Sequence, residues 1–312
     1  GLLAVDRQDE GEVLRVIDSL RELGISLTRK SRSVFPSTGS GPAAEAESEA
    51  EKVIAEIEEL GEAAARQAIP VGVLNTAVSL GKLGKEAARV GNTSLLLRAA
   101  LALGDTGKNA IRVNMKVPVR VTASALKEVG KEAARQKMED AVIASQLLLK
   151  DLGSFVTPGE GCFEGLSSCV VAPLREIGKA SAREGLEVAT TSAEVLLEEA
   201  QLRLNTEFFK RGKTNPGERK YYEESCNALT CLGEIGNLSA RRQLKKAAFQ
   251  AYLSLDIIKR DAKAKYLGNT TLNADAQLES LDKIKIHPGA QAGGREEIEK
   301  LHTEISARMD MF

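Results

Sequence analysis

Apolar residues recur along most of this chain at helical spacing. The stretch 126–135, LKEVGKEAAR, shows the pattern around Gly130. Small or apolar residues stand 11, 8, 7, 4 and 1 residues before that glycine and 3 and 4 after it, namely Val119, Thr122, Ala123, Leu126, Val129, Ala133 and Ala134. Steps of three and four residues mark one face of an α-helix, whereas a strand would alternate. The pattern predicts an all-α fold.

The same pattern returns at a fixed interval. A glycine with Leu or Ile four residues before it and Arg five residues after it occurs at Gly24, Gly61, Gly84, Gly107, Gly130, Gly178 and Gly236. From Gly61 to Gly153, which keeps the phase without the Arg, successive glycines are 23 residues apart. The equivalent positions in the last two repeats hold Gln201 and Lys259. Such periodicity indicates an array of stacked helices.

The repeat glycine lies on the apolar stripe. Glycine inside a helix costs about 0.5–1 kcal/mol relative to alanine, so its recurrence needs a compensating contact. We therefore expect a neighbouring helix to pack closely against each missing side chain.

Turn signals group the helices into pairs. Gly91 and Gly185 follow Gly84 and Gly178 by seven residues, and Asn92 begins an Asn-Thr-Ser sequence suited to the start of the next helix. Short turns are expected after Arg89, Arg135, Arg183 and Arg241, and longer connections at 113–117, 156–161 and 205–220. The predicted pairs are 10–66, 70–112, 118–155, 162–208 and 217–266.

Prolines and two irregular stretches complete the outline. Pro70 and Pro118 suit the first turn of a helix, and Pro173 should kink a helix or mark its true start. Residues 30–49 are rich in Ser, Gly, Pro and Ala and predict a flexible insertion. We expect a repeat array over 1–268 and a helical cap or tail over 269–312, with helices near 274–286 and 295–309.

The sequence 228–236, ALTCLGEIG, carries a Leu-Gly-x-Ile-Gly motif that is echoed at 80–84 and 174–178. It resembles HEAT-type helical repeats, in particular the phycobilisome-lyase-like class. The resemblance implies a right-handed α-solenoid used as a binding scaffold, and the predicted pairs give it about five antiparallel two-helix repeats. It carries no catalytic residue across to this chain.

Composition adds few constraints. The 43 Lys and Arg residues nearly balance the 44 Asp and Glu residues, so no overall field attracts nucleic acid or anionic membranes. Aromatic residues make up 4% of the chain, which predicts a core of Ala, Leu, Val and Ile. The four cysteines do not form a disulfide framework, so we expect a reducing compartment. The chain is expected to be cytoplasmic, either whole or as the soluble part of a larger or membrane-anchored protein.

Two groups of residues are candidate binding sites. A basic ridge would form if stacking aligned the Lys after each glycine with the Arg one turn later, namely Lys85, Arg89, Lys108, Arg112, Lys131, Arg135, Lys179 and Arg183. The alternative is that these cations pair on a solvated face, since Asp105, Glu128 and Glu176 stand three residues before Lys108, Lys131 and Lys179.

The second candidate is the basic and aromatic stretch 206–222. Its residues suited to stacking on bases or holding an acidic partner are Phe208, Phe209, Lys210, Arg211, Lys213, Arg219, Lys220, Tyr221 and Tyr222. Alternatively, the aromatic residues anchor the ends of two helices and the loop between them is solvated.

Other signals for chemistry are weak. Residues 104–109, GDTGKN, lack the first glycine and the final Ser/Thr of a phosphate-binding loop. Cys162, Cys169, Cys226 and Cys231 could hold a metal but suit a buried structural role better, and His287 and His302 have no evident catalytic partners. We expect a non-enzymatic scaffold for protein–protein interaction that uses no cofactor or metal. The alternatives are RNA or DNA binding through 206–222 and, less favoured, an enzyme with an undetected cleft.

Overall fold

A computed structural model of the chain describes residues 2–7, 9–31, 42–155, 167–211, 218–282, 300, 302–304 and 307. Within these residues every regular element is helical, which confirms the all-α prediction. The elements are α1 (Leu2–Asp6), α2 (Glu10–Lys30), α3 (Pro42–Arg66), α4 (Pro70–Val90), α5 (Thr93–Arg112), α6 (Lys116–Arg135), α7 (Glu139–Phe155), the π-helical turn η1 (Ser167–Val171), α8 (Ala172–Glu184), α9 (Glu187–Arg211), α10 (Glu218–Arg241), α11 (Lys245–Ala264) and α12 (Gly268–Asp282).

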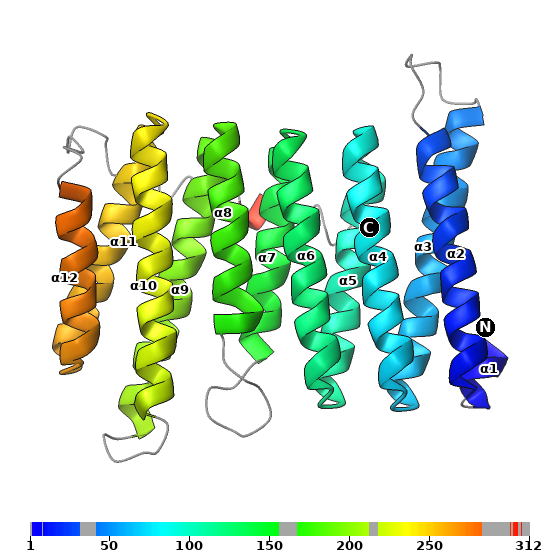
Figure 1. Cartoon of the computed structure of the whole chain (residues 1–312), viewed down its shortest axis with the longest axis horizontal. Coiled ribbons are helices and arrows are strands. Elements are labelled where there is room, and N and C mark those ends of the chain that lie inside the picture. The colour runs from blue at the N-terminus through cyan, green and yellow to red at the C-terminus, as the bar shows by residue number, and fades with distance from the viewer. Residues whose placement is uncertain are drawn as a thin grey trace. The chain divides into compact units, whose positions relative to one another are not determined.

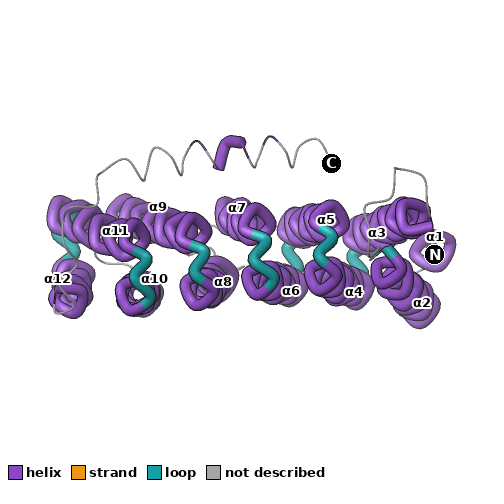
Figure 2. The backbone as a smooth tube through the Cα atoms, turned by 90° about the horizontal axis from the view of Figure 1, so that it is seen from above, coloured by secondary structure: helices purple, strands orange, loops and turns teal. Residues whose placement is uncertain are grey.

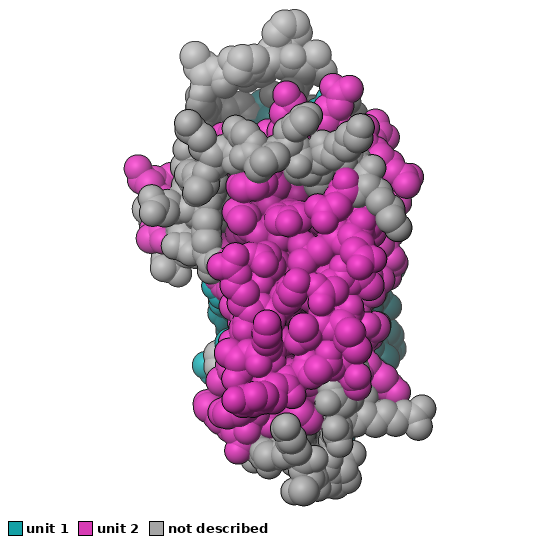
Figure 3. All heavy atoms as spheres, turned by 90° about the vertical axis from the view of Figure 1, so that its left-hand side faces the viewer, with its two compact units in different colours: residues 1–155, 308–312 teal, residues 156–307 magenta. Residues whose placement is uncertain are grey.

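The helices form two compact units, coloured separately in Figure 3: residues 1–155 with 308–312, and residues 156–307. Consecutive helices within a unit run antiparallel (Figure 1). In the first unit α2, α4 and α6 form one layer and α3, α5 and α7 the other; in the second unit α8, α10 and α12 face α9 and α11 (Figure 2). Helices contact both their partner and the next helix of the same layer. The two helices of each predicted pair contact each other, and the predicted tandem array of helices is confirmed.

Six of the repeat glycines are points of close helix packing, as predicted, namely Gly24, Gly61, Gly84, Gly107, Gly178 and Gly236. A Cβ atom added at Gly61 would lie 2.5 Å from Thr76 Cγ2, and one added at Gly107 would lie 2.6 Å from Leu152 Cδ2. In the layer of α2, α4 and α6, the residue before the next repeat glycine fills the space: Leu83 lies against Gly24, and Val129 against Gly84. At these glycines the neighbouring helix inserts a side chain where the glycine has none.

One type of turn joins the helices wherever the structure describes the connection completely. At each of the seven turns that the structure describes from end to end, one residue is left-handed, and it stands seven residues after the repeat position: Ala68, Gly91, Asn114, Lys137, Gly185, Gln243 and Tyr266. The following N–H donates to the carbonyl five residues back, as from Met115 to Ala110 at 2.8 Å, so the pattern is a Schellman motif. The residue that donates this bond, Met115 in the example, is the N-cap of the next helix. Each turn therefore has the same short length, and one helix with its turn accounts for the period of 23 residues.

The turns correct one prediction. The connection after Arg112 is not longer than the others, because α6 begins at Lys116 and only residues 113–115 form the turn. Asn114 takes the left-handed conformation with φ 59°, and Asn tolerates this region better than most residues because its short polar side chain can bond locally.

Three other boundaries differ from the sequence predictions. Residues 42–49 belong to α3, since their Ala and Glu residues favour a helix, and only 32–41 of the expected insertion lies outside the described residues. Residues 205–211 continue α9 and 218–220 begin α10, which leaves 212–217 outside the described residues. Pro173 stands in the first turn of α8, directly after the π-helical turn η1, so it marks the place where the helix changes type.

The expected boundary at 268/269 does not coincide with the division between units. Helix α12 begins at Gly268 and packs on α10 and α11 within the second unit. Leu281 approaches Gly236 as Leu83 approaches Gly24, so α12 has the position of a further first helix of a pair. Of the expected C-terminal helix, residues 300, 302–304 and 307 are described and are helical.

Candidate functional site

The residues of the predicted basic ridge lie on two layers. Lys85 and Arg89 on α4 share a layer with Lys131 and Arg135 on α6, whereas Lys108 and Arg112 are on α5 in the opposite layer. Lys179 and Arg183 belong to α8 in the second unit. A single ridge through all eight residues is therefore wrong, because the 23-residue period alternates between layers and only every second helix shares a face.

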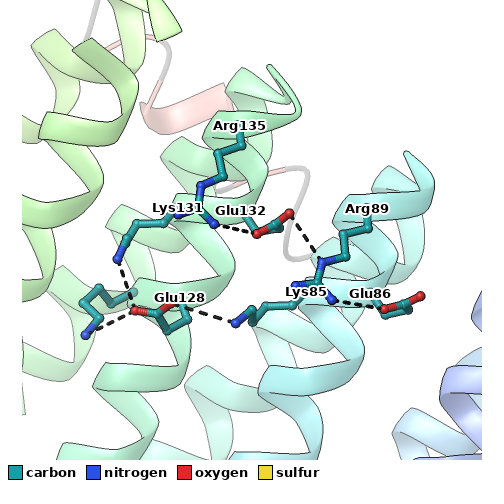
Figure 4. A network of polar contacts seen from close by, with 8 residues as sticks. Lys85, Glu86, Arg89, Glu128, Lys131, Glu132 and Arg135 are labelled. Atoms are coloured by element: carbon teal, nitrogen blue, oxygen red, sulfur yellow. Dashed lines mark hydrogen bonds and ion pairs between the residues drawn. The ribbon is translucent and has the colours of Figure 1, made fainter. Parts of the chain in front are cut away.

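Acidic residues join the arginines of neighbouring helices into a ladder (Figure 4). Glu132 of α6 lies 3.0 Å from Arg135 of the same helix and 3.5 Å from Arg89 of α4. Glu86 of α4 in turn lies 3.5 Å from Arg89 and 2.7 Å from Arg29 of α2. Each carboxylate thus connects its own helix to the preceding helix of the layer.

The lysines after the repeat glycines are paired in the same way. Lys131 lies 3.3 Å from Glu128 on its own helix, and Lys85 reaches the same carboxylate from α4 at 3.9 Å. Burial alone would raise the pKa of Glu128, but Lys131 and Lys127 outweigh this effect and lower that pKa.

The opposite layer and the second unit repeat this arrangement. Lys108 lies 3.5 Å from Asp105 on its own helix and 3.9 Å from Asp151 on α7. Lys179 instead lies 3.0 Å from Glu234 of α10. The expected partners of Lys108 and Lys131 are confirmed, and the lysines support stacking of the repeats.

Two aromatic residues of the stretch 206–222 anchor helix ends. Phe208 near the end of α9 stacks on Tyr221 near the start of α10, with ring centroids 4.0 Å apart and an interplanar angle of 12°. Both side chains are buried, and the Tyr221 hydroxyl donates to Asn205 Oδ1 at 2.8 Å. These two residues match the anchoring alternative.

Phe209 and Lys210 remain on the surface. Phe209 is 55% exposed, and Lys210 lies 3.5 Å from Glu207 with its side chain 65% exposed. Lys213 lies outside the described residues, and so do the side chains of Arg211, Arg219, Lys220 and Tyr222.

The structure adds Tyr266 to this end of the second unit. Tyr266 is 79% exposed and has φ 58° in the turn between α11 and α12. Lys265 Nζ donates to Thr206 Oγ1 of α9 at 3.0 Å, which ties that turn to the helix carrying Phe209. We call Phe209, Lys210 and Tyr266 the aromatic end. Tyr266 could have been noticed in the sequence. It stands seven residues after the repeat position, where other repeats have Gly91 and Gly185.

Buried polar side chains line α9 where it meets α10 and α11. Gln201 Nε2 donates to Ser225 Oγ of α10 at 2.8 Å and to Asn205 Oδ1 at 2.7 Å. Asn205 donates to Asp261 of α11 at 2.8 Å, and Ser254 of α11 donates to Glu198 at 2.8 Å. We call this set the polar seam.

Glu194 lies on the same helix and is fully buried. Neither of its carboxylate oxygens has a hydrogen-bond partner in the described structure. Burial raises its pKa well above the ordinary value, and the charge of Glu187 adds to this rise. Burial therefore favours the protonated form of the Glu194 carboxyl group.

His302 is placed differently from the sequence expectation. Its Nε2 lies 2.7 Å from Ser192 Oγ of α9, and the donor depends on the histidine tautomer. A hydroxyl beside an imidazole can act as a nucleophile with its base. Ser192 is fully buried and His302 is 8% exposed, so a substrate does not reach the pair in this conformation.

The described cysteines differ in their exposure to solvent. Cys169 and Cys231 are buried, Cys226 is exposed, and Cys162 lies outside the described residues. Burial raises the pKa of Cys231 to about 12, although nearby Arg175 opposes this rise. Within the described ranges no cluster of His, Cys, Asp and Glu is suited to a metal. Residues 104–109 lie within α5, so they do not form a phosphate-binding loop.

Comparison with known proteins supports the fold. No protein-family model matches the chain, and no curated protein matches it significantly. Among solved structures, a circular tandem repeat protein with novel repeat topology and enhanced subunit contact surfaces matches with a TM-score of 0.53 and 16% sequence identity. The match covers 99% of this chain and 73% of that protein. Over the described residues, no helix is both long and apolar enough to cross a bilayer.

Proposed function

We propose that the protein is a non-catalytic, HEAT-like scaffold that binds another protein at the aromatic end of its second unit. The exposure of Tyr266 carries this proposal. The left-handed conformation is shared by all seven fully described turns, but Tyr266 is the one aromatic residue among those that adopt it. At 79% exposure the Tyr266 ring contributes little to the core.

The neighbours of Tyr266 suit a protein partner. Phe209 offers a second exposed aromatic surface, and aromatic side chains are frequent anchors of protein interfaces. Lys210 and Lys263 are exposed and would favour acidic side chains around such an anchor. The proposed partner therefore presents an apolar surface with an acidic rim.

Substitution of Tyr266 by glycine tests the proposal. Tyr266→Gly relieves the left-handed strain, so the chain should fold at least as stably while losing its anchor. Affinity capture from the native source, quantified by mass spectrometry, should lose its main partner by about tenfold, as expected for an interface anchor. Lys137→Gly makes the same backbone change in a turn of the first unit and should leave capture unchanged. Equal capture by wild type and Tyr266→Gly would refute the proposal.

RNA or DNA binding is the alternative. It rests on the basic sequence around 206–222, but the buried stack removes Phe208 and Tyr221 from the residues available for bases. Filter retention at low salt with Lys210, Arg211 and Lys213 changed to Glu tests it, because phosphate contacts depend on cations. Retention that falls with these changes would favour nucleic acid.

A further inference from the structure

The burial of α9 differs from that of α11, the other helix of its layer in the second unit. Every residue from 189 to 198 is buried, whereas α11 keeps half-buried residues along its outer side, including Tyr252, Asp256 and Lys259. A helix in a two-layer array ordinarily has one side in solvent. Val188, one turn before Ser192, is 38% exposed. The outer side of α9 is therefore covered between about Ser192 and Glu198.

His302 belongs to the segment that covers it. Among the described residues of this segment, Lys300, Thr303, Glu304 and Ala307 are exposed and His302 is buried. Figure 2 shows the described turn on the outer side of the layer that holds α9 and α11. The hydrogen bond between His302 Nε2 and Ser192 Oγ places His302 beside α9.

The sequence around His302 has the pattern of an amphipathic helix. Ile298, Leu301, Ile305 and Met309 recur at steps of three and four residues, and His302 falls on the same face. Charged residues occupy most of the remaining positions. The segment thus offers one apolar face with a single polar group that can bond Ser192.

We propose that the outer face of α9 is a binding site for an amphipathic helix, and that the chain's own C-terminal segment is its intramolecular occupant. This surface is separate from the aromatic end. The fitting helix presents apolar residues at helical spacing and one neutral hydrogen-bonding side chain opposite Ser192. A charged residue at that point is disfavoured because the site is buried and Ser192 cannot neutralise it.

A labelled peptide of residues 295–312 tests the site on the full-length chain. In the wild-type chain the intramolecular segment occupies the face, so the peptide should bind weakly. His302→Asp places a charge at the buried contact and weakens the intramolecular segment, so fluorescence anisotropy should show at least about tenfold tighter peptide binding. His302→Ala, which removes the bond without adding a charge, should also bind more tightly than wild type.

Two controls define the outcome. Lys300→Asp changes an exposed residue of the segment and should behave as wild type, while Ser192→Asp combined with His302→Asp should bind no peptide because the face itself is altered. Circular dichroism checks that each variant is folded. Equal binding by wild type and both His302 variants, or no binding by any of them, would overturn the proposal. The capture experiment with Tyr266→Gly is independent of this result.

Discussion

The repeat position holds different kinds of residue in the two units. Helices α3 and α5 of the first unit have glycine there, whereas α9 and α11 of the second unit have long polar side chains. In the first unit Gly61 of α3 and Gly107 of α5 leave space that Thr76 and Leu152 occupy. In the second unit Gln201 of α9 instead brings an amide that bonds Ser225, and Lys259 of α11 brings an ammonium that pairs with Asp275. The turns on both sides have the same geometry, so one backbone period accommodates close apolar contact or a polar connection.

The difference affects what holds each unit together. Apolar contact at a glycine is non-directional and depends on shape, because an added methyl group has no room. The polar seam depends on directional hydrogen bonds, since a buried hydrogen-bonding group without its partner costs free energy, and Gln201 Oε1 is already such a group in the described structure. Substitutions at equivalent positions should therefore affect the two units through different mechanisms.

The largest effect is expected at Gly61. Gly61→Leu would place its Cβ 2.5 Å from Thr76 Cγ2 and 2.9 Å from Thr76 Cβ, which cannot rotate away. The free energy of unfolding of the first unit should fall by about 3 kcal/mol, as measured by urea denaturation. Gly268→Leu is the control, because an added Cβ at Gly268 meets nothing within 4 Å. A stable Gly61→Leu chain would show that α3 and α4 can separate.

Removal of the amide at Gln201 should have a somewhat smaller effect. Gln201→Met keeps the length of the side chain but leaves Ser225 and Asn205 without this donor. The second unit should lose about 2 kcal/mol in the same measurement. Gln136→Met, at the exposed end of α6, should change stability by less than about 0.5 kcal/mol. No loss at Gln201 would mean that the seam is replaceable by apolar contact, as in the first unit.

Glu194 makes the stability of the second unit depend on pH. Because burial raises its folded pKa, the folded state keeps this proton at pH values where the unfolded chain has lost it. Stability is therefore full below the ordinary value of 4.5 and decreases as pH rises toward the raised pKa. Glu194→Gln should raise the Tm at about pH 8 and change it less at about pH 4.

The control for this experiment is Glu184→Gln, at the exposed end of α8. It should leave the pH dependence of Tm as in the wild-type chain. If Glu194→Gln gave the same shift at both pH values, proton binding by Glu194 would not be the cause.

Substitutions at the left-handed turn residues should have the smallest effect on the free energy of unfolding, and this effect should be equal in the two units. Lys137→Gly and Gln243→Gly each relieve a left-handed residue, with φ 57° and 61°, and should each raise the free energy of unfolding by about 1 kcal/mol. Gly91→Ala should lower it by a similar amount, because Gly91 has φ 78°. Thermal unfolding of the three variants is sufficient to measure these changes. A different response of Lys137 and Gln243 would show that the two turns are not equivalent.

Local sequence patterns were sufficient to predict the helices and the close contacts. The glycine phase predicted the pairs because each helix and its turn occupy 23 residues, and both are formed by interactions between residues near in sequence. The packing against Gly84 followed from its place on the apolar stripe. The neutralisation of Lys108 and Lys131 could also be anticipated, because Asp105 and Glu128 are one helical turn away.

The candidate sites were less accessible to sequence reasoning. Phe208 and Phe209 are adjacent in the chain, yet only Phe208 is buried, because the helix continues past 205 and turns the two side chains in different directions. Tyr266 could have been noticed at its turn position, but its proximity to α9 depends on the bond from Lys265 to Thr206, which are 59 residues apart. The uniform burial of residues 189–198 could have been suspected from the sequence, because apolar and polar residues are not separated onto two faces of the helix there.

The sequence by itself determined the helical period, the turn positions and the small residues at the contacts. Backbone hydrogen bonds and the steric size of glycine act within a few residues, so their consequences are readable along the chain. Only the tertiary structure decided that the predicted ridge is divided between layers, that Arg89 bridges Glu86 and Glu132, and that His302 lies against Ser192. These contacts join distant residues, and their formation depends on how whole helices stack and bury polar groups together.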